Sequence, residues 1–317
     1  MANSTWYEIF MEMLYKKYPK KNQLAEALMD LLCIEREAVY RRLRQDVIFP
    51  VNEIVKIATA WNISLDETIG TKVLFRMQPM NYLDPSEADM VFVHERVSAL
   101  KQLKNITNSE FLLIVNTLSR SLTAGFKYLY KFNVFKWAYH YSNETINIPY
   151  SQIIIPEKLL KEIDVFYKRM RYVTNTSYIL DSKIFEYTVQ EIQFFHSIFL
   201  ITDEDKELIK QDLYALLDYL LEIANTGYFP ETKNKVQMYI SMLNINTNYS
   251  YFYDGINEAC RVHSFNMYDN ITYNQQMIEN FKVWMQKKKR TSIQISETDE
   301  KSRIEFFMKQ RKLIDSL

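Results

Sequence analysis

Glycine is almost absent from this chain: its 317 residues include four, at positions 70, 125, 227 and 255. Because glycine is costly inside helices, and because long side chains are frequent here, this composition favours helices. The spacing of the glycines also excludes the phosphate-binding loops GxGxxG and GxxxxGK(S/T), and no GxSxG nucleophile motif occurs. We therefore expect a mainly helical protein without a glycine-rich nucleotide site.

Length and charge limit the remaining classes of protein. A chain of 317 residues suits two domains, and 48% hydrophobic with 25% charged residues is typical of a globular protein. The formal net charge is zero, so any binding to nucleic acid must come from a local patch. No apolar run reaches the roughly 18 residues of a membrane span, and the N-terminus lacks a signal-peptide pattern. We expect a cytoplasmic protein with no membrane partner.

Residues that commonly bind metals or act as nucleophiles are few and scattered. Cys33 and Cys260 are the two cysteines, and we predict that both are reduced and buried. The four histidines lie far apart in the sequence, outside any HExxH motif: His94, His140, His196 and His263. We therefore predict no metal, no cofactor and no enzymatic activity. An enzyme with an unmarked site in the helical region is kept as an alternative.

The apolar spacing divides the chain near residue 70. Helical periodicity predicts five short helices before that point, near 6–18, 22–32, 35–45, 51–61 and from Ser64 to Gly70. Residues 71–85 contain the breakers Pro79 and Pro85 and are predicted to be a linker. The domain boundaries are therefore 1–70, 71–85 and 86–317, the last being a regulatory or dimerisation domain.

Long helices dominate the predicted C-terminal domain. Periodicity places them near 86–104, 108–124, 126–140, 157–173, 182–200, 203–225, 273–289 and 299–316. Thr202 is predicted as an N-cap and Gly227 as a C-terminal stop. Period-2 alternation over 235–265, with the turn dipeptide Asp254-Gly255, predicts a small antiparallel β-meander. The predicted fold class is mainly α: a five-helix bundle followed by a multi-helical domain with this inserted meander.

The most specific pattern runs from Leu28 to Gly70 and reads LMDLLCIEREAVYRRLRQDVIFPVNEIVKIATAWNISLDETIG. Cys33-Ile34 stands at a turn between two helices, Val39 is a buried aliphatic residue of the second helix, and ISLD followed by IG closes the stretch. This pattern resembles the lambda-repressor-like (XRE-type) helix-turn-helix family. The resemblance is confined to the N-terminal domain. It departs from the family at Cys33, where glycine is usual, and at Leu43, where an acidic residue is common.

The resemblance implies that helix 35–45 enters the DNA major groove and reads base edges. With Val39 and Leu43 facing the core, the resemblance places Arg36, Glu37 and Arg41 at base-reading positions. Basic residues suited to phosphate contact are Arg42, Arg44, Lys20 and Lys21. The candidates for DNA contact are Arg36, Glu37, Tyr40, Arg41, Arg42, Arg44, Lys20 and Lys21. Between positions 36 and 44, four arginines against one glutamate give a local charge of +3 in a neutral chain.

We therefore expect a sequence-specific transcriptional regulator that binds double-stranded DNA. A homodimer is expected by analogy, because such domains usually bind paired half-sites. A small-molecule or protein effector at the C-terminal domain is left open, and the aromatic-rich stretch 126–137 fits helix packing, a ligand pocket or a dimer seam. The alternative is a helix-turn-helix protein-interaction adaptor that does not bind DNA, which Glu35 and Glu37 favour.

Overall fold

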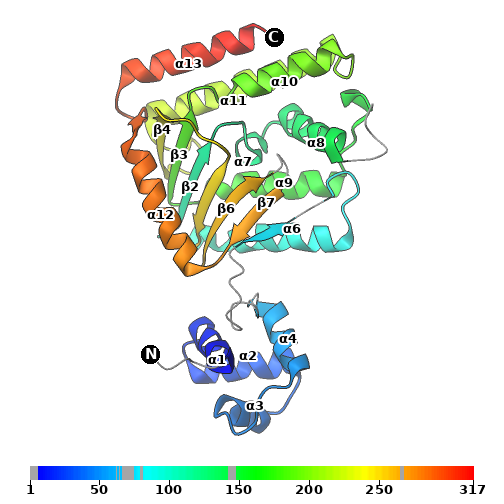
Figure 1. The fold of residues 1–317 in the computed structure, drawn as a ribbon, viewed down its shortest axis with the longest axis vertical. Coiled ribbons are helices and arrows are strands. Elements are labelled where there is room, and N and C mark those ends of the chain that lie inside the picture. Colours follow the sequence, from blue (N-terminus) through cyan, green and yellow to red (C-terminus); the bar gives the residue numbers. More distant parts are fainter. Residues whose placement is uncertain are drawn as a thin grey trace. The chain divides into compact units, whose positions relative to one another are not determined.

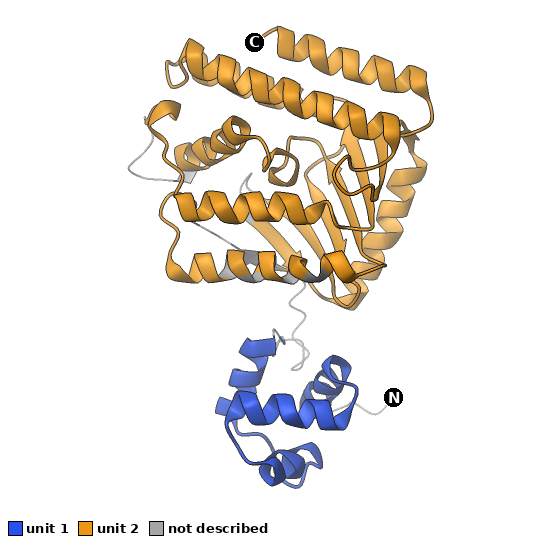
Figure 2. Ribbon diagram, turned by 180° about the vertical axis from the view of Figure 1, so that it is seen from behind, with its two compact units in different colours: residues 1–74 blue, residues 75–317 orange. Residues whose placement is uncertain are grey.

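Two sets of buried side chains, far apart in the sequence, form two compact units. The computed structural model describes residues 6–61, 63, 65, 75–78, 81–141, 148–264 and 268–317. The chain divides into unit 1, residues 1–74, and unit 2, residues 75–317, drawn in blue and orange in Figure 2. Each unit has its own hydrophobic core.

Unit 1 consists of short amphipathic helices whose apolar faces meet in one core. Its described helices are α1 (Trp6–Lys17), α2 (Lys21–Leu32), α3 (Arg36–Leu43) and α4 (Val51–Trp61). They confirm four of the predicted helices, whereas the fifth, from Ser64 to Gly70, lies almost entirely outside the described residues. The fully buried side chains Phe10 and Phe49 meet edge to face, with ring centroids 6.3 Å apart. The phenolic oxygen of Tyr7 accepts a hydrogen bond from the Phe49 amide at 3.1 Å, which fastens the segment before α4 to α1.

Unit 2 is organised around a mixed β-sheet (Figure 1). In its described part the sheet has eight strands in the order β1-β7-β6-β5-β2-β3-β4-β8. Strands β2, β3 and β4 are parallel to one another, and the remaining neighbours pair antiparallel. The strand bounds are β1 Arg76–Gln78, β2 Glu110–Val115, β3 Asn175–Asp181, β4 Lys235–Ser241, β5 Tyr249–Tyr253, β6 Glu258–Ser264, β7 Tyr268–Thr272 and β8 Ser292–Gln294.

The helices of unit 2 cover the two faces of this sheet unequally. Phe111, Leu113 and Val115 of β2 point into the main core, together with buried residues of α7–α11 and α13. Leu112 and Ile114 point to the opposite face, where they share a smaller core with α12. The helix bounds are α6 Glu87–Ala99, α7 Arg120–Thr123, α8 Lys127–Tyr141, α9 Glu157–Met170, α10 Glu186–Ser197, α11 Asp203–Thr226, α12 Gln275–Arg290 and α13 Glu300–Asp315, with 3-10 turns at Leu100–Asn105 and Tyr150–Gln152.

The prediction of a mainly α fold is wrong, because unit 2 is an α/β structure. Residues 108–124 were expected to be helical, yet β2 occupies their first half as a central strand. A parallel strand buried on both faces is a continuous apolar run, so periodicity cannot separate it from a buried helix. The alternating stretch 235–265 does contain β4, β5 and β6, but it is not one meander. Strand β4 pairs with β3 and β8, and the antiparallel meander is β5-β6-β7.

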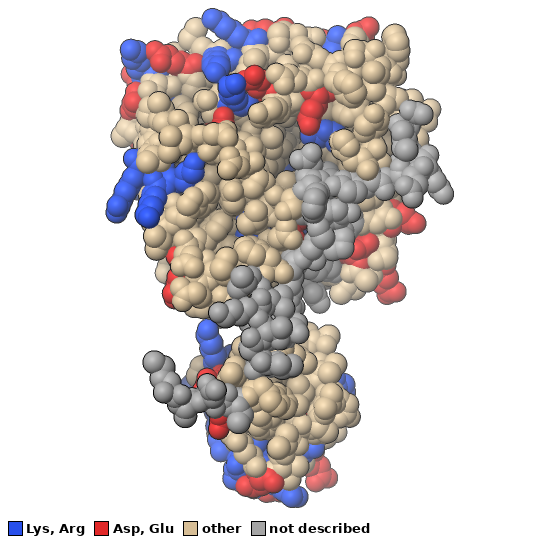
Figure 3. Space-filling model, viewed as in Figure 1, with Lys and Arg blue, Asp and Glu red and all other residues tan. Residues whose placement is uncertain are grey.

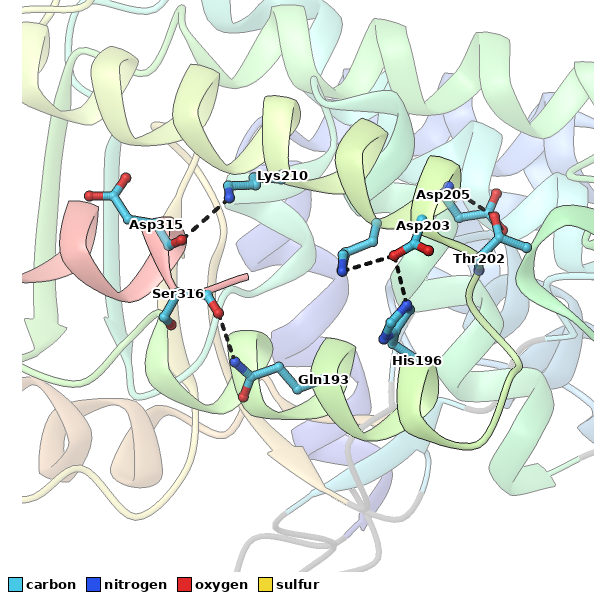
Figure 4. Close-up of polar contacts among 9 residues, drawn as sticks. Gln193, His196, Thr202, Asp203, Asp205, Lys210, Asp315 and Ser316 are labelled. Carbon is cyan, nitrogen blue, oxygen red and sulfur yellow. Dashed lines mark hydrogen bonds and ion pairs between the residues drawn. The ribbon is translucent and has the colours of Figure 1, made fainter.

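The C-terminal helix α13 is fastened to α10 and α11 by polar contacts (Figure 4). Gln193 of α10 donates to the backbone carbonyl of Ser316 at 3.2 Å, and Lys210 of α11 donates to that of Asp315 at 3.4 Å. At the start of α11, Asp203 bonds both His196 (3.0 Å) and Lys206 (3.1 Å). These contacts join three helices on the main-core side of the sheet.

The predicted ends of α11 are confirmed. Thr202 and Asp205 form a capping box, in which each side chain accepts a bond from the other residue's amide. Gly227 ends the helix in the left-handed conformation with φ of 73°, where a Cβ would also collide with Glu297. Among the described residues, no helix combines the length and apolar character needed to cross a membrane.

Candidate nucleic-acid interface

Helices α2 and α3 are joined by a turn that depends on one left-handed residue. Cys33 caps α2 with φ of 56° and ψ of 45°, and its amide donates to the carbonyl of Met29 at 2.9 Å. A side chain is disfavoured in this conformation, which explains why glycine is usual at this turn in the family that the sequence resembles. Cys33 is exposed, so its predicted burial is wrong, whereas Cys260 is buried as predicted.

Helix α3 buries one face and leaves the other outside. Val39 and Leu43 are 0% and 5% exposed and belong to the core of unit 1. The predicted base-reading residues Arg36, Glu37 and Arg41 lie exposed on the remaining surface. Arg44, predicted to contact phosphate, is also exposed, and Tyr40 is half-buried. Figure 3 shows both basic and acidic side chains over the end of unit 1 where Figure 1 places α3.

Tyr40 connects the exposed face of α3 to the first turn of α2. Its hydroxyl donates to the Asn22 side-chain oxygen at 3.1 Å. The Arg36 guanidinium and the Lys21 ammonium lie 5.6 Å and 5.9 Å from the centre of the Tyr40 ring. The structure thus brings together residues that the sequence analysis assigned separately to base and phosphate contact.

The N-terminus of α2 carries positively charged side chains, which are normally unfavourable at the start of a helix. Its N-cap residue Lys20 makes no side-chain capping bond, and the first turn contains no acidic residue. The first turn begins instead with Lys21. Because the free amides and the helix dipole make this end positive, two lysines here are favourable only beside an anion such as a phosphate.

Arg42 is held inside unit 1. Its Nε and Nη2 atoms donate to the two carboxylate oxygens of Glu53 on α4 at 2.7 Å and 2.8 Å, and its Nη1 donates to the carbonyl of Ala38 at 3.0 Å. The side chains of Arg42 and Glu53 are 16% and 14% exposed. This geometry makes Arg42 a link between α3 and α4.

The other arginines of α3 differ in how far they are engaged. Arg44 is paired with Asp46 at 2.9 Å and with Glu37 at 3.1 Å. The guanidinium of Arg41 makes no hydrogen bond or ion pair with any residue that the structure describes. The effective positive charge of the surface is therefore smaller than the arginine count indicates, and Arg41 is the most available of the α3 arginines.

The α/β fold of unit 2 creates a second candidate location, which the sequence analysis missed. Ligands of open α/β sheets bind beyond the carboxyl ends of the parallel strands. Here the connection 242–248 crosses that edge, because β5 lies on the far side of β2 from β4. The Asn248 side chain accepts from the Asn116 amide at 3.0 Å, and Asp181 accepts from the Ile245 amide at 3.3 Å. These polar side chains are used to hold the crossing segment in place.

A charged cluster lies on strands β6 and β7. His263 and Asp269 are hydrogen bonded at 3.1 Å. Burial would raise the pKa of Asp269, but the His263 bond and the charges of Arg120 and Arg261 outweigh it and hold this pKa well below its usual range. Within the described residues, no three His, Cys, Asp or Glu side chains form a group that could hold a metal ion.

Comparison of the chain with protein-family models, with curated proteins and with solved structures finds no match. The interpretation of the α2–α3 surface therefore depends on the residues and contacts described above.

Proposed function

We propose that this chain is a sequence-specific DNA-binding transcriptional regulator that inserts α3 into the major groove of duplex DNA. The observation that carries the proposal is the arrangement of α3, which buries Val39 and Leu43 and presents Arg36 and Arg41 on its exposed face. An α-helix fits the major groove, and arginine there can bind guanine O6 and N7 together. The second support is the uncapped, lysine-bearing start of α2.

The proposal gives different roles to the basic residues. Arg36 and Arg41 read guanines, and Glu37 accepts from a cytosine amine. Lys20 and Lys21 contact phosphates beside the α2 terminus. Arg42 is left out of DNA contact, because its guanidinium is already bound to Glu53. A homodimer that binds two half-sites is part of the proposal, by analogy with other helix-turn-helix proteins.

The test is fluorescence-anisotropy titration of random duplex DNA at low and at physiological salt, followed by selection of the bound sequences. We expect affinity to fall steeply with salt, because phosphate contacts release counterions. On a selected site, Arg41→Ala should lower affinity by about 1–3 kcal/mol and relax the preference at one position. Lys20→Ala should weaken all sequences alike and reduce the salt dependence.

Lys16→Ala is the matched control, because Lys16 is an exposed cation of α1 outside the α2–α3 surface. It should leave both affinity and sequence preference unchanged. Unchanged specific binding by Arg41→Ala would mean that α3 does not read bases through this residue. Absence of binding even at low salt would reject DNA binding and favour the adaptor alternative, in which the same surface contacts a protein.

A further inference from the structure

A pocket opens on the α12 side of the sheet in unit 2. It has a volume of about 350 Å³. Residues of the crossing segment, two strands and α12 line it: Asn244, Ile245, Asn246, Tyr249, Val262, Phe281, Trp284 and Lys288. Phe281, Trp284 and Lys288 lie on one face of α12, because they are spaced by three and four residues.

Three aromatic rings form much of the pocket wall. The Tyr249 ring centre lies 4.8 Å from that of Trp284 and 5.9 Å from that of Phe281, and the last two are 5.5 Å apart. The rings are inclined to one another by 48–58° and are half-buried. The three rings pack against the smaller core and remain partly exposed. Such walls suit a flat ring, which can stack on one of them and meet the edge of another.

Lys288 is the one charged residue among those that line the pocket, and the amides of Asn244 and Asn246 both donate and accept hydrogen bonds. Lys288 donates to the Asn244 carbonyl at 3.1 Å, which uses one of its three N–H groups. The Trp284 indole N–H and the Tyr249 hydroxyl make no hydrogen bond with any described residue. None of the lining residues is acidic. The positive charge of Lys288 repels an organic cation and attracts an anion, so the pocket favours an anionic ligand.

The position of the pocket matches the edge where α/β sheets bind ligands. Asn244, Ile245 and Asn246 lie in the segment that follows β4, which ends at Ser241, and Tyr249 pairs with Ile114 near the carboxyl end of β2. The strand order reverses at this point, because the chain leaves β4 and continues beyond β2. Such reversals are the usual ligand sites of open sheets.

From these observations we propose that unit 2 binds a small aromatic carboxylate in this pocket. The ring lies among Tyr249, Phe281 and Trp284, and the carboxylate pairs with Lys288. An engineered apolar cavity of about 150 Å³ holds one benzene ring, so a pocket of about 350 Å³ suits a molecule of one or two fused rings. This site does not depend on DNA binding by unit 1.

The experiment is calorimetric titration of the full chain, without DNA, with benzoate, indolecarboxylate and naphthoate. We expect at least one to bind with a Kd of about 1 mM or tighter. The neutral amide of the best ligand should bind about tenfold more weakly, which corresponds to about 1.4 kcal/mol. Lys288→Met should abolish that preference. Lys287→Met is the matched control, because the neighbouring lysine is exposed and does not line the pocket.

Trp284→Leu should weaken the carboxylate and the amide alike, about tenfold, since it removes one wall of the pocket. Circular dichroism checks that each variant is folded. If Trp284→Leu does not fold, the comparison of Lys288→Met with Lys287→Met still tests the proposal. The proposal is wrong if none of the three acids binds at about 1 mM. It is also wrong if acid and amide bind equally to the wild type, or if Lys287→Met has the effect expected of Lys288→Met.

Discussion

The ion pair between Arg42 and Glu53 predicts that Glu53→Ala strongly destabilises unit 1. In the wild type, two charge-assisted hydrogen bonds of 2.7 Å and 2.8 Å join the two side chains, which are 16% and 14% exposed. The variant leaves the Arg42 guanidinium desolvated and without a counter-charge, although its bond to the Ala38 carbonyl remains. Glu53 is outside the proposed DNA surface, so stability can be measured separately from binding.

The magnitude follows from the burial of the pair. Removing one partner of a fully buried ion pair costs about 3–5 kcal/mol, whereas an exposed pair contributes at most about 1 kcal/mol. With 16% and 14% of the two side chains exposed, the pair is much closer to the first case. We therefore expect Glu53→Ala to lower the free energy of unfolding of unit 1 by about 2–4 kcal/mol.

The assay is amide hydrogen exchange of α2 and α3 in the full chain, which reports the opening of unit 1 alone. Each 1.4 kcal/mol of lost stability should make the protected amides exchange about tenfold faster. Arg44→Ala is the control, since Arg44 is 46% exposed and its pairs with Glu37 and Asp46 lie at the surface. If Glu53→Ala accelerates exchange no more than Arg44→Ala does, the structural role assigned to Arg42 is incorrect.

Three further predictions concern single residues. Cys33→Gly should stabilise unit 1 by about 0.5–1 kcal/mol in amide exchange, because glycine relieves the left-handed conformation, while Cys33→Ala should bring no such gain. Since the pKa of Asp269 is held below its unfolded value, its contribution to stability is present above about pH 4 and is lost as the pH falls further. Urea midpoints between about pH 5 and 3 should therefore fall less steeply for Asp269→Asn than for the wild type, and parallel curves would contradict this. Asn248→Ala should lower the stability of unit 2 by about 1–3 kcal/mol, because it removes the hydrogen-bond acceptor of the half-buried Asn116 amide, whereas the exposed Asn246 should tolerate alanine.

The sequence predicts the local structure of this chain far better than its architecture. Helix periodicity locates α1–α4 and the long helices of unit 2, and the caps at Thr202 and Gly227 appear where the residue types require them. The alternation over 235–265 likewise finds β4, β5 and β6. These signals are readable because each depends on residues a few positions apart.

The fold class was missed where a strand is buried on both faces. In β2 and in Tyr178-Ile179-Leu180 of β3, consecutive side chains enter opposite cores, so no polar face marks the strand. The strand pairing of β4 was not predicted, because its partners are β3 and β8. The residues next to β4 in the sequence do not specify which distant strands it pairs with. The candidate DNA residues could be named from the sequence, but the engagement of Arg42 by Glu53 could not, since the spacing along α3 does not show what α4 presents to it.

The placement of β5 beside β2 affects how the protein is made. The two strands are neighbours in the sheet but lie far apart in the sequence. The hydrogen bond between Asn116 and Asn248, for example, joins residues that are 132 positions apart. A ribosome adds roughly 5–20 residues per second, so β2 emerges on the order of ten seconds before the strand that covers its edge. During that interval the apolar run Phe111–Val115 presents an unpaired edge, which is a template for association with other chains. We therefore expect the yield of native protein during synthesis to depend on chaperones that protect this strand until β5, at Tyr249–Tyr253, has been translated.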